Sequence, residues 1–268
     1  GSDSYGYSFK DSAELDGPTY DWTDITSSGT KLLGSSSDGS QGPFNIGFDF
    51  EFYENSFDKF YNGGDNGYIT FGGGSPSRWT PYSIPSSQLQ PNSIIGGWFD
   101  GGFCLTQNAD SGVYYETMGT AGSRKLIVQM EDQVYYGARQ GTYYCNSGNV
   151  WSTNTITWQI ILHEGSNNVV IQYKDAMGGS YYDNEYLTSG IQGNVNGAQY
   201  GIEYKYRSTP GNIPAETAVE FVAPPPKRND LALGSTSIPE PMSLAEENIL
   251  GATVTNNGVN CGAVDGSE

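Results

Sequence analysis

The chain has 268 residues, of which 13% are aromatic and 16% are charged, and 30 acidic against 12 basic residues give a formal net charge of −18. This balance excludes nucleic acid and anionic membrane surfaces as expected partners, because both require clustered Lys and Arg. No apolar run approaches the roughly 20 residues that span a bilayer, so we expect no membrane insertion.

The first part of the chain, residues 1–43, is polar and rich in Gly and Ser. One aromatic patch interrupts it at residues 20–25, and we expect this patch to form an edge strand. The composition of residues 34–40 indicates a loop.

Strand-like alternation begins near residue 47. In residues 47–53, three Phe alternate with two acidic residues, so the Phe side should face a core. An Asn-Gly turn at 66–67 precedes a strand at 68–71. Residues 75–93 contain four Pro and indicate a long extended loop, before an apolar strand at 93–99.

The second half of the chain repeats this pattern. Residues 155–163 are the clearest strand, because Ile156, Trp158, Ile160 and Leu162 share one face. The further predicted strands are residues 113–117, 125–131, 169–174, 187–192, 200–207 and 217–222. We therefore predict an all-β fold, a two-sheet antiparallel β-sandwich of the jelly-roll type over residues 1–222.

Three consecutive prolines at 224–226 predict a stiff linker over residues 223–228. Beyond it, residues 229–268 contain two strand-like segments, 230–238 and 249–255. Two strands cannot form a sandwich alone. This C-terminal β tail is therefore either part of a further module or a segment that exchanges strands with another chain.

The order of these strands resembles the nidogen-type (NIDO-like) β-sandwich module of secreted and cell-surface proteins. The matching phrases include "FNIGFDFEFY" at residues 44–53, "NGYITFG" at 66–72 and "TITWQIILHEGSNNVVIQYK" at 155–174. The remaining matches are residues 94–100, 112–117, 126–132 and 188–197. The resemblance implies an extracellular, structural or adhesive module without catalytic machinery. The tail, from "NDLALGSTSIPEP" to "ATVTNNG", resembles the start of an adhesion-type Ig-like repeat.

Catalytic signatures are not found in the sequence. His163 is the only histidine and should face solvent at the end of its strand, and no GxSxG, HExxH or phosphate-binding motif occurs. Glu116, Glu131 and Asp132 are candidate carboxylates for glycoside hydrolysis, but among 30 acidic residues some will be neighbours by chance. We expect that the protein is not an enzyme.

Calcium is the one cofactor that the sequence points to, and none is required for folding. Asp58, Asp65, Asp100 and Asp110 lie in or beside loops rich in Gly and Asn, which suits a cation that prefers carboxylate and carbonyl oxygens. The alternative is that these are solvated turn residues.

Three tyrosine pairs are candidate ligand-binding platforms, because an aromatic face stacks on sugar rings while its hydroxyl stays solvated. They are Tyr135 and Tyr136, Tyr143 and Tyr144, and Tyr181 and Tyr182. Packing within the sandwich is the alternative explanation for these pairs.

The three cysteines do not form a CxxC motif, which argues against a zinc site. A disulfide between Cys104 and Cys145 is predicted, with two free thiols as the alternative. Cys261 is left without a partner.

The predicted function is that of a non-enzymatic extracellular surface, adhesion or structural protein that assembles into fibres through its C-terminal strands. Its expected partners are further copies of itself, other cell-surface proteins or glycans. The alternative is a carbohydrate-binding module of a larger secreted protein.

Overall fold

The computed structural model describes residues 1–32, 40–63, 66–74, 82–99, 103–105, 109–135, 155–177, 187–206, 213–225, 231–237 and 251–256. Within these ranges the regular structure is β-strand, and there is no α-helix. By its contacts the chain divides into two units, Gly1–Pro224 (unit 1) and Pro225–Glu268 (unit 2), and each is described by itself.

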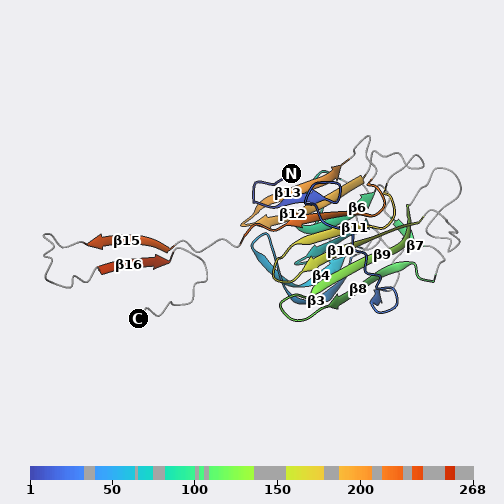
Figure 1. The fold of residues 1–268 in the computed structure, drawn as a ribbon, viewed down its shortest axis with the longest axis horizontal. Coiled ribbons are helices and arrows are strands. Elements are labelled where there is room, and N and C mark those ends of the chain that lie inside the picture. Colours follow the sequence, from blue (N-terminus) through green and yellow to red (C-terminus); the bar gives the residue numbers. More distant parts are fainter. Residues whose placement is uncertain are drawn as a thin grey trace. The chain divides into compact units, whose positions relative to one another are not determined.

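Unit 1 contains two antiparallel sheets (Figure 1). Its strands are β1 (Ser8–Asp11), β2 (Thr30–Leu32), β3 (Gln41–Phe52), β4 (Asn55–Asn62), β5 (Tyr68–Phe71), β6 (Asn92–Phe99), β7 (Phe103–Leu105), β8 (Gly112–Met118), β9 (Lys125–Tyr135), β10 (Ile156–His163), β11 (Val169–Tyr173), β12 (Leu187–Val195), β13 (Ala198–Tyr206) and β14 (Thr217–Val222). Their alternation of apolar and polar residues explains why they are strands, and the predicted β-sandwich is confirmed.

The larger sheet has eight strands in the order β1-β14-β11-β10-β9-β8-β2, with β7 pairing beside β9. The predicted strands at residues 113–117 and 125–131 are confirmed as β8 and β9, which form a hairpin paired from Gly112–Glu131 to Met118–Lys125. The smaller sheet has six strands in the order β13-β12-β6-β5-β4-β3.

The core lies between the two sheets. On β3, the predicted Phe side is confirmed, because Phe48, Phe50 and Phe52 are buried while Asp49 and Glu51 are exposed. From the other sheet, Trp158 is fully buried in the same core cluster. Each such side chain contributes about 1.5–3 kcal/mol by leaving water, which is why period-two patterning is enough to select the sandwich.

The prediction of an edge strand at residues 20–25 is wrong. The edges of the larger sheet are β1 and β2, and residues 17–25, the N-terminal covering segment, run in extended form over the outer face of that sheet. Glutamine side chains of the sheet bind its backbone in place of a neighbouring strand. The aromatic composition indicated extended backbone correctly, but it did not indicate how that backbone is paired.

A second covering segment, residues 82–91, lies over the outer face of the smaller sheet. Gln192 of β12 accepts a hydrogen bond from the N–H of Ser86 (2.7 Å) and donates one to the carbonyl of the same residue (3.1 Å). Glu203 of β13 accepts the N–H of Ile84 (2.9 Å). The prediction of an extended loop agrees with this segment.

Unit 2 contains β15 (Leu231–Ser237) and β16 (Gly251–Asn256), which form a two-stranded antiparallel sheet. A two-stranded sheet is marginally stable by itself. Across both units, the described residues contain no helix that is long and apolar enough to cross a membrane.

Candidate functional site

Four connections of unit 1 begin and finish at one end of the sandwich, which we call the loop end. In the larger sheet, β9 ends where β10 begins, and the start of β14 pairs with the end of β11, Thr217 opposite Tyr173. In the smaller sheet, the end of β6 pairs with the start of β12, Phe99 opposite Leu187. The hydroxyl of Tyr173 donates to the carbonyl of Gly96 (2.6 Å), so these strand ends belong to the same end of both sheets.

At the opposite end, the turn end, the β5–β6 connection of residues 72–91 is long, since Phe71 pairs with Asn92, and four other connections are short turns. They are residues 53–54, 119–124, 164–168 and 196–197. The four connections at the loop end are residues 100–111, which include β7, and residues 136–155, 174–186 and 207–216. Most of the long connections between neighbouring strands of unit 1 therefore start and end at the loop end.

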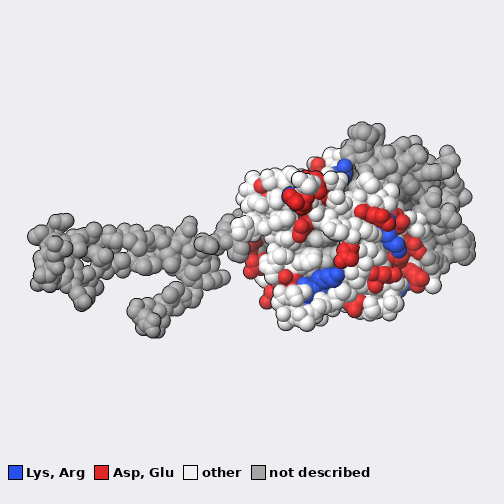
Figure 2. Space-filling view, in the orientation of Figure 1, with Lys and Arg blue, Asp and Glu red and all other residues white. Residues whose placement is uncertain are grey.

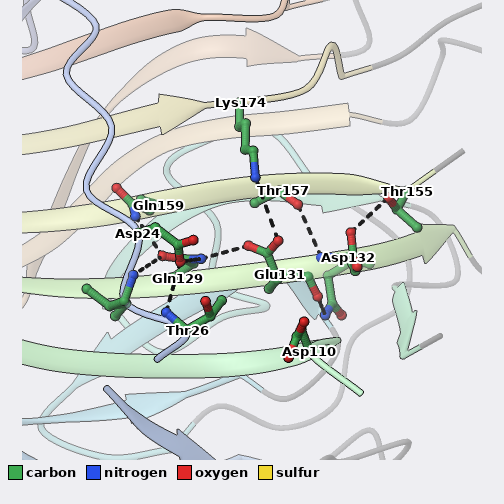
Figure 3. Close-up of polar contacts among 12 residues, drawn as sticks. Asp24, Thr26, Asp110, Gln129, Glu131, Asp132, Thr155, Thr157, Gln159 and Lys174 are labelled. Carbon is green, nitrogen blue, oxygen red and sulfur yellow. Dashed lines mark hydrogen bonds and ion pairs between the residues drawn. The ribbon is translucent and has the colours of Figure 1, made fainter. Parts of the chain in front are cut away.

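A β-bulge at the loop end places several acidic side chains together (Figure 3). The register of β9 and β10 shifts between Ile156 and Trp158, and Asp132 takes a positive φ of 50° there. The Asp132 N–H donates to the Thr157 hydroxyl (3.2 Å), and Thr155 donates to the Asp132 carboxylate (3.0 Å). These contacts fix the carboxylate at the rim of the sheet.

Glu131, the residue before the bulge, is buried on the outer face of the larger sheet. Its carboxylate accepts a hydrogen bond from Gln129 (2.7 Å) and lies 3.8 Å from the ammonium of Lys174. Burial raises the pKa of Glu131, because the charged form loses solvation. Burial also raises the pKa of Asp175, which follows the lysine.

Asp24 brings a further carboxylate to this group from the N-terminal covering segment (Figure 3). The backbone N–H of Thr26 donates to it (2.9 Å) and is the main cause of its lowered pKa. Gln129 also donates to Asp24 (3.2 Å). Asp24 and Glu131, with opposite pKa shifts, thus share one glutamine amide.

Three buried glutamines form a row across neighbouring strands. Gln129 of β9, Gln159 of β10 and Gln172 of β11 are opposite one another in register, and none is more than 2% exposed. Gln172 accepts the N–H of Asp21 (2.7 Å) and donates to its carbonyl (2.9 Å), while Gln129 accepts the N–H of Ile25 (3.1 Å). The row therefore holds the N-terminal covering segment by its backbone.

The covering segment presents two stacked aromatic rings beside the acidic group. The rings of Tyr20 and Trp22 have centroids 6.3 Å apart at an interplanar angle of 24°. The ammonium of Lys174 lies 5.6 Å from the centre of the Trp22 ring. Aromatic rings, carboxylates and one ammonium group together can offer stacking, hydrogen-bonding and ionic contacts to a ligand.

Of the predicted calcium residues, the structure describes two. Asp58 is exposed on β4 and pairs with Lys59 (3.0 Å), whereas Asp110 precedes β8 in the other sheet. Asp65 and Asp100 lie outside the described residues. No cluster of three or more His, Cys, Asp or Glu side chains suited to a metal occurs within the described ranges.

The tyrosine and cysteine predictions fall mainly on connections of the loop end. Tyr135 ends β9 and Cys104 lies on β7. The other predicted positions lie outside the described residues, namely Tyr136, Tyr143, Tyr144, Tyr181, Tyr182 and Cys145. The disulfide and the tyrosine platforms stay predictions.

His163 is partly buried rather than solvent-facing, and burial lowers its pKa. It ends β10 at the turn end, seven residues from Ile156, or about 23 Å along the strand from the acidic group. Glu116 and Glu131 pair with Ile127 and Gly112 respectively. Four residues along β8 separate these positions by roughly 13 Å, beyond the span of about 5–9.5 Å that paired glycosidase carboxylates use.

Sequence reasoning missed the glutamine row and the Tyr20–Trp22 pair as parts of one surface. The available signal was that Gln129, Gln159 and Gln172 occupy polar-side positions of strands whose other side is apolar. Their alignment depends on strand register, which one sequence does not give.

A family model described as NIDO related matches residues 7–230 of the chain. No curated protein and no solved structure matches the chain.

Proposed function

The chain belongs to the NIDO-related family, and on this premise we propose that it is a non-enzymatic adhesion or structural module of the extracellular surface. Modules of this family are generally structural parts of extracellular proteins. Adhesion is the more specific part of the proposal, and the observation that carries it is the set of four connections that start and end together at the loop end. Long connections on a rigid scaffold are where binding residues concentrate.

The acidic group and the aromatic pair support binding near this end. Carboxylates of Asp24, Glu131 and Asp132 accept hydrogen bonds and attract basic groups, while Tyr20 and Trp22 supply apolar area. Figure 2 shows acidic residues spread over the visible face of unit 1 with few basic ones among them. A partner with a basic or hydroxyl-rich surface suits this chemistry.

The test is adhesion of protein-coated beads to cells and to immobilised matrix proteins. Replacing residues 139–150 at the loop end by a Gly-Ser linker should abolish adhesion. Exchanging the turn-end pair Asn196-Gly197 for Asp-Gly should leave adhesion unchanged. Equal adhesion by both variants, with matching melting temperatures, would contradict the proposal.

Assembly into fibres through the C-terminal strands is the second part of the proposal. The two strands of unit 2 are a marginal sheet alone, and pairing with another chain would satisfy their free backbone groups. Electron microscopy and light scattering of the full chain and of a chain that stops after Pro225 test this part. Fibres that persist without residues 226–268 would refute assembly through the tail.

Carbohydrate binding is the alternative function, and the stacked Tyr20–Trp22 pair is the observation that favours it. Tryptophan and tyrosine faces stack on the apolar faces of sugars. Binding to a defined glycan on an array, lost in Trp22→Ala and kept in Tyr82→Ala, would support it. The control residue is exposed on the second covering segment.

Calcium binding by the acidic loops stays a prediction. A cation that binds only the folded state raises the melting temperature. Equal melting temperatures in excess calcium and in chelator would contradict the prediction of calcium binding.

A further inference from the structure

Of the four strands that end the two sheet orders of unit 1, namely β1, β2, β3 and β13, three are short or covered, and the side strand β7 has only three residues. At β1, residues 1–3 fold back, with Phe9 donating to the Gly1 carbonyl (3.1 Å) and Asp3 donating to the Tyr7 carbonyl (2.9 Å). The edge strand β2 has only three residues. Such short or covered edges prevent pairing with other chains.

The β3 edge is closed by side chains from the facing sheet. Thr117 donates to the carbonyl of Ile46 (2.6 Å), and the Arg124 guanidinium donates to the carbonyl of Gly47. The N–H of Glu51 donates to the Asn167 side chain (3.0 Å). Three β3 residues therefore have backbone partners away from β4.

The fourth edge, β13, is nine residues long and pairs only with β12 among the described strands. The β12–β13 hairpin turns at Asn196-Gly197, both with positive φ, and closes at the pair Val195–Ala198. In a two-residue hairpin the closing pair is hydrogen-bonded and pairs alternate from there. Ala198, Tyr200 and Ile202 therefore bond to β12.

The residues between them point their backbone groups away from β12. They are Gln199, Gly201 and Glu203. The partner residue on β12 shows the same phase of pairing. Asn194 lies opposite Gln199, and its N–H points away from β13 and donates to Asn92 on the β6 side (3.0 Å). Within the described part of the chain, no hydrogen bond to the backbone of these three residues occurs.

This edge is complementary to a second copy of itself. Placing Gly201 opposite Gly201 of the second copy sets Gln199 opposite Glu203 of that copy, so all three outward-facing residues on each strand become hydrogen-bonded pairs. On the outer side, the Gln199 amide can donate to the opposing carboxylate. On the core side, Tyr200 meets Ile202 of the second copy, an aromatic and β-branched pair that stabilises antiparallel strands.

We propose that unit 1 dimerises by antiparallel pairing of β13 with β13 of a second copy, centred on Gly201. The two six-stranded sheets then form one continuous sheet across a two-fold axis, which is the commonest symmetry of homo-oligomers. Each copy carries a formal net charge of −18, so the dimer forms more tightly as salt screens the repulsion. This contact is independent of the C-terminal strands.

Sedimentation equilibrium of the full chain at physiological ionic strength tests the contact with two matched variants. Gln199→Pro removes an outward N–H that β12 does not use, and Gln199→Ala removes the same side chain but keeps that N–H. The dimer loses two hydrogen bonds in the proline variant, so its dissociation constant should rise by at least about tenfold. The alanine variant should stay within about threefold.

Amide hydrogen exchange of the unmodified protein provides a readout that does not depend on folding of a variant. The N–H groups of Gln199, Gly201 and Glu203 should become protected as concentration rises through the dimer range. A chain that is monomeric at all accessible concentrations, or a dimer in which these amides stay unprotected, overturns the proposal. A dimer lost when residues 226–268 are removed, with unprotected β13 amides, assigns association to the tail instead.

Discussion

At the scale of single residues, Glu164 shows how one surface carboxylate organises the turn end. It accepts hydrogen bonds from the backbone N–H of Gly122 (2.8 Å) and Arg124 (2.9 Å) and from the Arg124 guanidinium. These bonds favour the charged form and lower the pKa of Glu164 to about 2. One side chain thus joins the β8–β9 turn to the β10–β11 turn.

The pH dependence of stability follows from this shift. Because the folded-state pKa lies below the unfolded value of about 4.3, the stabilisation by Glu164 is complete above that value and is lost as pH falls toward 2. The melting temperature of Glu164→Gln should therefore lie below that of the parent protein near neutral pH, and the two should converge by about pH 2. Glu216→Gln is the control. A constant gap from pH 7 to pH 2 would show that the carboxylate charge is not the cause.

At the scale of elements, buried glutamines attach extended segments to both outer faces. Gln172 of β11 binds both backbone groups of Asp21, and Gln192 of β12 binds both backbone groups of Ser86. A side-chain amide carries the same donor and acceptor as a peptide group, so it can replace a neighbouring strand. A buried glutamine that binds both backbone groups of one residue thus holds a covering segment on each sheet of the sandwich.

Removing one of these amides tests its role. Gln172→Leu removes both hydrogen bonds to the backbone of Asp21 and should lower the free energy of unfolding by about 1–3 kcal/mol. Gln88→Leu, at a partly exposed position, should change the free energy of unfolding by less than about 0.5 kcal/mol. Urea unfolding measures both. Equal values for the two variants would mean that the covering segment is held by other contacts.

At the scale of the whole molecule, the acidic surface is the dominant electrostatic property. A formal net charge of −18 on 268 residues favours solubility and opposes compaction by self-repulsion. Among the basic side chains that the structure describes, Arg124 pairs with Glu164 and Lys59 with Asp58. The remaining acidic groups repel one another in the folded state.

Salt should therefore stabilise the fold. Raising sodium chloride from about 0.01 M to 0.15 M shortens the Debye length from about 30 Å to 8 Å, and the melting temperature should rise. A series in sucrose at the same osmolarity is the control, because sucrose is excluded from the protein surface but does not screen charges. A melting temperature that falls with added salt at neutral pH would show that attractive ion pairs outweigh the repulsion.

The strands could be predicted because their signal is local. In β3 the burial alternates as the sequence pattern indicates, and in β10 Ile156, Trp158, Ile160 and Leu162 are buried in the core as predicted. The burial of the other face of β10 was not predicted. Residues 20–25 could not be assigned in this way. Extended backbone looks the same in sequence whether a strand or a row of glutamines binds it.

The sequence by itself determined the fold class, because period-two burial leaves a large aromatic face that only a second sheet can cover. It also determined the acidic surface and, through its strand phrases, the family. Tertiary structure alone decided which carboxylates share a surface, which edges are closed and how Gln129, Gln159 and Gln172 align. These features depend on strand order and register, and both are set by contacts between residues far apart in the chain.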